Sequence, residues 1–158
     1  RALRGLPPHP LLGDDPILKV TAFVDGASRG NPGPAGFGAV LRTDRGDLIE
    51  LCGYLGTTTN NVAEYTGLIE ALLAAKEEGA TEIDVVSDSL LLVNQINGQY
   101  RVKHPNLIPL FNKAMRLARE FRRFTIRHTL RAGNKEADRL ANLAVDRADG
   151  RWVERRRE

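Results

Sequence analysis

Four acidic residues occupy positions where a carboxylate is unusual, which makes them candidates for chemistry. Asp25 and Asp88 each follow an apolar, β-branched run that is typical of a buried strand. Glu64 and Asp138 fall near the beginning of segments with helical periodicity. Taken singly, each has an ordinary interpretation. Asp25 could be a turn residue and Asp88 a helix cap, while the other two could be favourable charges at helix N-termini.

As a group, the four acids are harder to explain structurally. Carboxylates that converge without lysine partners repel one another strongly in a low dielectric. A divalent cation removes this repulsion, and hard oxygen ligands suit Mg²⁺ or Mn²⁺. Two such ions ~3.5–4 Å apart can activate a water and stabilise the leaving oxygen of a phosphodiester. The chain offers no rival chemistry, because it has no G-x-S-x-G motif and its glycine-rich loop lacks the G-x-G-x-x-G order.

The elements that must position these acids follow from the change in hydrophobic period along the chain. We expect strands at 17–24, about 36–42, 47–55, 81–87 and 124–130, and helices at 62–78, 89–96, 105–121 and 134–148. A turn at 44–46 joins the second and third strands, and Asn60 or Asn61 is the expected N-cap of the first helix. The order predicts an α/β fold: a mixed five-stranded sheet, three antiparallel strands then two further strands, with helices packed on it. Strand ends and helix starts would then bring the four acids to one edge.

Composition limits the class of protein. The chain has 158 residues, of which 42% are hydrophobic, which predicts one folded domain at 17–148. Residues 1–16 resemble a flexible, proline-containing tail or linker and not a secretory signal, and 149–158 resemble a basic C-terminal tail. No apolar run approaches the ~18 residues of a membrane helix, so we expect no membrane partner. The single cysteine, Cys52, cannot form an intrachain disulfide, and we expect it to be a buried thiol. A reducing, cytoplasmic setting fits this cysteine usage. We also expect the protein to be a monomer.

Charge hints at a polyanionic partner without establishing one. The formal net charge is +3 and the pI is about 9.3. Arginines concentrate in two places, at 116–131 and at 155–157. Such runs are also common on ordinary solvated surfaces, so charge alone leaves both interpretations open.

Four motifs, in order, resemble those of the type 1 ribonuclease H family. They are DGASRGNPGPAG at 25–36, TTNNVAE at 58–64, DVVSDS at 84–89 and NKEADRLA at 134–141. The resemblance covers about residues 17–148 and implies a ribonuclease H-like fold. It further implies that Asp25, Glu64, Asp88 and Asp138 bind two Mg²⁺ ions, with Mn²⁺ as an alternative. The implied activity is hydrolysis of the RNA strand of RNA–DNA hybrids, which leaves 5′-phosphate and 3′-hydroxyl ends.

The resemblance also implies a set of substrate-binding residues. They are Ser28, Asn31, Thr59, Asn60 and Asn61. Short hydroxyls and amides can reach the 2′-hydroxyls of RNA in a shallow minor groove. Thr59 and Asn60 could also hold a DNA phosphate at the helix start. A tight turn at 31–33 and ordinary helix capping are the structural alternatives.

Two positions depart from the common family pattern. The basic, tryptophan-containing handle that many members carry after the second helix is reduced here to NGQYRVK at 97–103, which resembles the handle-less branch of archaea and some bacteria. The mobile catalytic histidine corresponds by spacing to His128, yet Arg131 lies in the loop where that group is expected. Either residue, or neither, could assist product release.

Two rival functions remain at this point. One is a catalytically weak module that only binds hybrids, and the other is a nuclease of the same fold that acts on different nucleic-acid structures. The intact acids disfavour the first, because binding alone requires basic and amide groups. The amide-rich groove disfavours the second.

Overall fold

Three long antiparallel strands begin the fold, and most of their residues are buried. In the computed structural model, which describes residues 16–158, they are β1 (Lys19–Ser28), β2 (Gly33–Thr43) and β3 (Asp47–Thr58). Val20, Ala22 and Val24 of β1 point into the main core, so the alternate side chains, including Asp25, lie on the other face. The predicted turn between β2 and β3 is confirmed at Asp44 and Arg45.

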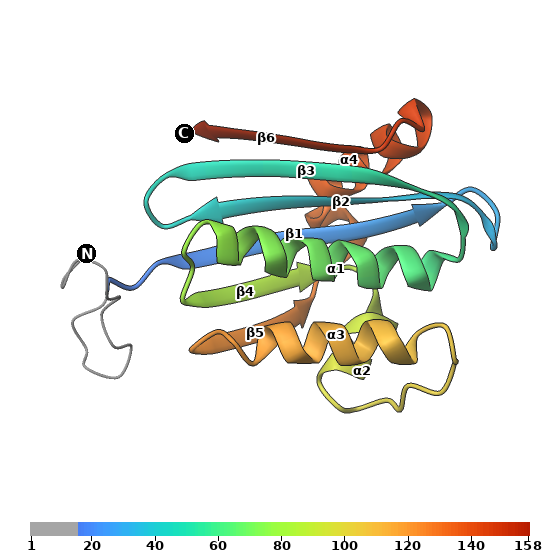
Figure 1. The fold of residues 1–158 in the computed structure, drawn as a ribbon, viewed down its shortest axis with the longest axis horizontal. Coiled ribbons are helices and arrows are strands. Elements are labelled where there is room, and N and C mark those ends of the chain that lie inside the picture. Colours follow the sequence, from blue (N-terminus) through green and yellow to red (C-terminus); the bar gives the residue numbers. More distant parts are fainter. Residues whose placement is uncertain (1–15) are drawn as a thin grey trace.

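The remaining elements alternate helices and strands. They are α1 (Asn60–Glu77), β4 (Glu82–Ser87), α2 (Leu90–Ile96), α3 (Ile108–Ala118), β5 (Arg123–His128), the short 3₁₀ helix η2 (Arg131–Gly133), α4 (Lys135–Arg147) and β6 (Arg151–Arg157). The sheet order is β5-β4-β1-β2-β3-β6, with β4 parallel to both β1 and β5 (Figure 1). The α/β fold and the mixed sheet are therefore confirmed.

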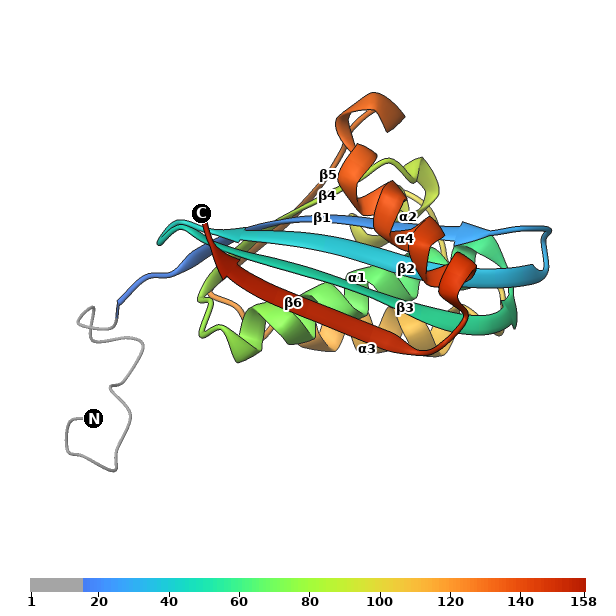
Figure 2. The same ribbon diagram turned by 90° about the horizontal axis from the view of Figure 1, so that it is seen from above.

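Helices cover both faces of this sheet unequally. Figure 2 shows α1 and α3 on one face and α4 alone on the other. The larger core lies under α1 and α3, where Leu68 and Leu72 of α1 are fully buried against the strands. The smaller core lies under α4 and includes the buried thiol of Cys52, as predicted; burial raises the pKa of this thiol. Among residues 16–158, no helix is both long and apolar enough to cross a membrane.

The sheet has six strands rather than the predicted five. The sixth, β6, is most of the segment that was expected to be a basic tail, and it pairs antiparallel with β3. Its sequence, RWVERRR, lacks apolar alternation because arginines project from both faces and pair with acids on neighbouring elements. Strand signals that depend on hydrophobicity miss such a strand.

Several predicted boundaries also need correction. β1 does not end at Asp25 but continues to Ser28, because β2 keeps pairing with it as far as Ala35. The N-cap of α1 is Thr59 rather than Asn60 or Asn61, since the Thr59 Oγ1 accepts a hydrogen bond from the Val62 N–H at 3.2 Å. α3 is shorter than predicted. Of the predicted N-terminal tail, residues 1–15 lie outside the described part of the chain.

Candidate active site

Three of the four predicted acids meet at one edge of the sheet. The register pairs Val24 of β1 with Ser87 of the parallel strand β4, so the next residues, Asp25 and Asp88, lie side by side. Glu64 comes from the second turn of α1, which packs across β1. Oxygens of Asp25, Glu64 and Asp88 lie within 4.8 Å of one another. The predicted convergence of these acids is therefore what the fold produces.

Asp138 completes the group from α4, which covers the face of the sheet opposite to α1. It lies in the first turn of α4, is half-buried, and contributes to raising the pKa of Asp25. A cleft of about 360 Å³ opens over the four acids. Its lining residues are Asp25, Gly26, Ala27, Ser28, Asn60, Glu64, Asp88, Arg131, Asp138 and Asn142. The cleft draws side chains from both faces of one sheet edge.

Two glycines allow the helices to approach the strands closely enough to form this site. A Cβ on Gly26 would lie 2.4 Å from the Glu64 backbone nitrogen, and a Cβ on Gly38 would lie 2.4 Å from the Ala137 carbonyl oxygen. Both distances are far below van der Waals contact, so any side chain would push α1 or α4 outward. The close approach also lets the Gly26 N–H donate to Glu64 Oε1 at 3.0 Å. Gly26 therefore both admits α1 and orients its carboxylate.

Asn134 anchors the beginning of α4 beside the acids. Its side chain is 1% exposed, and its Nδ2 donates to the Val24 carbonyl at 2.9 Å, next to Asp25 in the sequence. Its own carbonyl accepts the Asp138 N–H at 3.1 Å. One residue thus links the strand that carries Asp25 to the helix that carries Asp138. In the sequence, Asn134 begins the NKEADRLA motif, and no separate role was predicted for it.

The electrostatics of the cleft differ from those of an ordinary protein surface. Burial, together with the neighbouring Asp88 charge, raises the pKa of Glu64 to about 8, although the Gly26 hydrogen bond and Arg131 partly oppose this. Burial raises the pKa of Asp25 well above its usual range as well, and the charges of Glu64, Asp88 and Asp138 add to the effect. Asp25 and Glu64 therefore hold a proton more readily than exposed carboxylates do, and a cation bound in the cleft would oppose this.

The donor set fits a hard divalent cation. Every group in the acid cluster offers carboxylate oxygens, and the structure places no cysteine or histidine among the residues that line the cleft. Oxygen-only sites with room for water are typical of Mg²⁺ and Mn²⁺. A cation would also offset the repulsion that raises the pKa of Glu64. Asp25, Glu64 and Asp88 are thus placed to hold metal directly, with Asp138 beside them.

The predicted substrate-binding residues surround the N-terminus of α1. Ser28 and Asn60 line the cleft, and the Ser28 Oγ donates to the Thr58 carbonyl at 3.0 Å. Asn31 Oδ1 accepts the Asn60 N–H at 3.0 Å, so it tethers the β1–β2 loop to α1. Thr59 caps α1, and Asn61 lies half-buried in its first turn, outside the cleft lining. The structure therefore gives Thr59 the capping role that the sequence had left open as an alternative, and it gives Asn31 a link between its loop and α1.

The two candidates for product release occupy different places. His128 is exposed at the end of β5 and does not line the cleft. Arg131 begins η2, lines the cleft, and lies near enough to lower the pKa of Glu64. The structure thus distinguishes the two residues by their position relative to the cleft, which sequence spacing could not do.

One further cleft residue, Asn142, was not predicted from the sequence. It lies one helical turn after Asp138 and lines the cleft beside it. Because side chains at i and i+4 share a face of a helix, its position could have been inferred once Asp138 was assigned.

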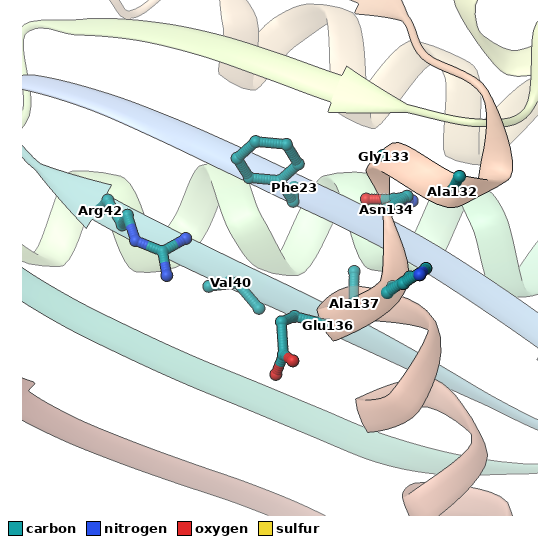
Figure 3. Close-up of a pocket in the computed structure, with 9 residues that line it drawn as sticks. Phe23, Val40, Arg42, Ala132, Gly133, Asn134, Glu136 and Ala137 are labelled. Carbon is teal, nitrogen blue, oxygen red and sulfur yellow. The ribbon is translucent and has the colours of Figure 1, made fainter.

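A second cavity lies on the α4 face of the sheet, beside the junction of η2 and α4 (Figure 3). Phe23 and Val40 line it from the strands, with Arg42 and Glu136 also on its walls. Glu136, its only carboxylate, pairs with Arg139 at 3.2 Å. This cavity lacks converging acids and does not share the chemistry of the cleft.

Comparison with known proteins links this arrangement to a family. A family model described as reverse transcriptase-like matches residues 23–144. The chain is 50% identical over 133 residues to the bifunctional protein Rv2228c of Mycobacterium tuberculosis, covering 83% of this chain and 36% of that protein. It is 43% identical to ribonuclease HI of Halobacterium salinarum, covering 82% and 66%. It is 35% identical to ribonuclease H of Coxiella burnetii, covering 85% and 95%.

Solved structures agree with the fold. The N-terminal ribonuclease H domain of the M. tuberculosis protein matches with a TM-score of 0.79 at 50% identity, covering 83% of this chain and 96% of that one. LC11 ribonuclease H1, solved in complex with an RNA/DNA hybrid, matches with a TM-score of 0.76 at 40% identity, covering 82% and 98%. The chain spans 36% of the length of the mycobacterial relative, so it corresponds to one region of that protein.

Proposed function

The chain belongs to the type 1 ribonuclease H family, and from this premise we propose that it hydrolyses the RNA strand of RNA–DNA hybrids in a two-metal-ion reaction. The expected products carry 5′-phosphate and 3′-hydroxyl ends. One observation supports this proposal above all others: carboxylate oxygens of Asp25, Glu64 and Asp88 lie within 4.8 Å of one another. Such a cluster destabilises a protein unless it binds cations.

The ions, when bound, would supply an activated water and neutralise charge on the leaving oxygen. The chain's own residues hold and orient this chemistry. Asp25, Glu64 and Asp88 supply ligand oxygens, and Asp138 adds a fourth carboxylate from α4. The Gly26 N–H fixes the direction of the Glu64 carboxylate. Mg²⁺ is the expected ion, with Mn²⁺ as an alternative, because all the donors are hard oxygens.

Recognition of the RNA strand belongs to the polar groups around the start of α1. Ser28 and Asn60 line the cleft next to the acids, where a 2′-hydroxyl beside the scissile phosphate would lie. Asn31 supports the same surface by tethering its loop to α1. Thr59 and Asn61 flank Asn60 in the first turn, and we assign them the phosphate and RNA contacts that the family resemblance implies.

Arg131 is the better candidate for assisting departure of the product. A guanidinium in the cleft attracts the 5′-phosphate and stays charged at every physiological pH. His128 points from an exposed strand end and would have to move to reach the same phosphate. We therefore assign this role to Arg131.

A cleavage assay with three substrates tests the proposal. An RNA–DNA hybrid, double-stranded RNA and double-stranded DNA of one sequence are incubated in parallel with Mg²⁺ and resolved on a gel. Cleavage of the hybrid's RNA strand alone, with 5′-phosphate ends, is expected. Hybrid binding without cleavage would instead indicate a binding module, and cleavage of the DNA duplex would indicate a nuclease of different specificity.

A further inference from the structure

Asn142 contacts the Asp138 carboxylate inside the cleft. Its Nδ2 donates to Asp138 Oδ1 at 3.3 Å and to the Asp138 backbone carbonyl at 3.0 Å. The side chain is half-buried and lines the cleft with the acids. Asparagine is a poor helix former, so its presence in the middle of α4 calls for a reason beyond helix stability. The contact with a site carboxylate supplies one.

Arg29 contacts Asn142 from the loop between β1 and β2. Its Nη2 donates to Asn142 Oδ1 at 3.4 Å and to the Asn142 carbonyl at 3.3 Å. The same group also forms an ion pair with Asp146 at 2.7 Å, between two largely exposed side chains. The loop is also tied to α1 through Asn31, so it connects the two helices that carry Glu64 and Asp138. A continuous chain of contacts therefore runs from this loop through Asn142 to Asp138.

We propose that Asn142 is a positioning residue of the carboxylate site: it holds Asp138 for metal binding and is itself held by Arg29. This inference rests on the proposed function, and it adds a connection between the loop at 29–32 and the metal ligands. A neutral amide is well suited to the task, because it orients a carboxylate without bringing a positive charge that would compete with the ions. Arg29 remains outside the acid cluster and acts on it only through Asn142.

Direct metal binding tests the first half of the proposal. Asn142→Leu is nearly isosteric and favours helix, so it removes the amide without opening a cavity. In calorimetric titration with Mn²⁺ and no substrate, its metal dissociation constant should rise ~10-fold, the effect typical of a residue that orients a ligand. The Mg²⁺ concentration for half-maximal hybrid cleavage should rise similarly, while the KM for hybrid at saturating Mg²⁺ changes less than ~2-fold. Asn142→Gln keeps the amide and should lose less.

A double-mutant cycle tests the second half. Arg29→Gln should weaken Mn²⁺ binding in the wild-type background and have no further effect in Asn142→Leu. Asp146→Asn, which removes the ion pair but leaves the contacts to Asn142 in place, is the control and should change Mn²⁺ affinity less than ~2-fold.

The outcomes are distinguishable. Unchanged Mn²⁺ affinity in Asn142→Leu, or equal losses in Asn142→Leu and Asn142→Gln, would overturn the role of the amide. Additive effects of Arg29→Gln and Asn142→Leu would overturn the link to Arg29. Failure of the wild-type protein to cleave any hybrid would reject the proposed function alone, because the titration needs no substrate.

Discussion

Two regions of the molecule treat buried acids in opposite ways. On the β6 flank, Asp47 and Glu50 of β3 are buried, and each is met by arginines of β6, at 3.2 Å from Arg155 and 3.1 Å from Arg156. At the cleft edge, Asp25 and Glu64 are equally buried, yet within residues 16–158 neither forms a salt bridge. In the first arrangement, arginines offset the desolvation cost of the buried carboxylates. In the second, that cost is offset only when a cation binds from solution.

The β6 flank also accounts for the arginines that end the chain. Arg151 pairs with Glu70 of α1 and Arg155 with Glu78, the C-cap residue of α1, so β6 joins the helix layer to the sheet edge. The arginines of β6 are therefore paired within the fold. Charge composition overestimates the surface that this end of the chain offers to nucleic acid, whereas the acid cluster indicates where a cation and a phosphate would bind.

The largest expected effect is at the cleft edge. Asp25→Asn keeps the shape of the side chain but removes a ligand charge, so hybrid cleavage should fall at least ~1,000-fold, equal to about 4 kcal/mol of transition-state stabilisation. Single-turnover assays with Mg²⁺ and a labelled hybrid measure this loss. Hybrid affinity, from electrophoretic mobility, should change little. Wild-type cleavage by Asp25→Asn would contradict the assignment of the cleft as the metal site.

The next effect separates the two residues near the rim of the cleft. Arg131→Ala should lower steady-state kcat by ~10–100-fold, because product release loses its phosphate contact. Single-turnover cleavage should change less than steady-state turnover. Because an arginine does not titrate near neutrality, the loss should be the same at each pH tested. The matched variant, His128→Ala, should turn over like the wild type; a pH-dependent loss there would transfer the role to histidine.

The contrast between the two regions also explains which features of the fold and the site could be predicted from the sequence. The acids, the fold class and most elements could be predicted, because apolar periodicity and the four motifs are local signals. β6 could not be, because its strand character depends on partners such as Glu70 and Glu50 that are remote in sequence. The sequence also could not predict the choice between His128 and Arg131 or the role of Asn142. They depend on the position of η2 and on the approach of Arg29, which sequence spacing does not encode.

A smaller effect concerns stability in the absence of metal. Burial and the Asp88 charge raise the pKa of Glu64 from 4.5 to about 8, so the folded state holds a proton that the unfolded chain releases. The stability that this proton confers is complete below pH 4.5 and is lost as pH rises to about 8. Glu64→Gln removes the contribution of Glu64 and leaves that of Asp25, whose pKa is also raised. With EDTA at about pH 8.5, it should be more stable than wild type by on the order of 2 kcal/mol.

Thermal unfolding at a series of pH values measures this difference. The curves of the two proteins should converge towards about pH 4.5 and separate above it, and adding Mg²⁺ should stabilise only the wild type. A wild-type protein whose stability with EDTA rose across this range would show that the cleft carboxylates are already neutralised by groups of the chain.

The smallest expected effect has the opposite sign and lies on the β6 flank. Glu50→Gln removes the charge that meets Arg156 at 3.1 Å and Arg139 at 3.7 Å, and both arginines are about half exposed. Because water can solvate the freed guanidinium groups, the loss should be about 1 kcal/mol of unfolding free energy, measured by urea titration. Glu154→Gln, an exposed acid that contacts the same Arg156 at 3.6 Å, is the control and should cost less than ~0.5 kcal/mol. If Glu50→Gln instead stabilised the protein as Glu64→Gln should, the arginines of β6 would not offset the burial of Glu50. The distinction between the two regions would then lie in their distance from the metal site and not in how their charges are paired.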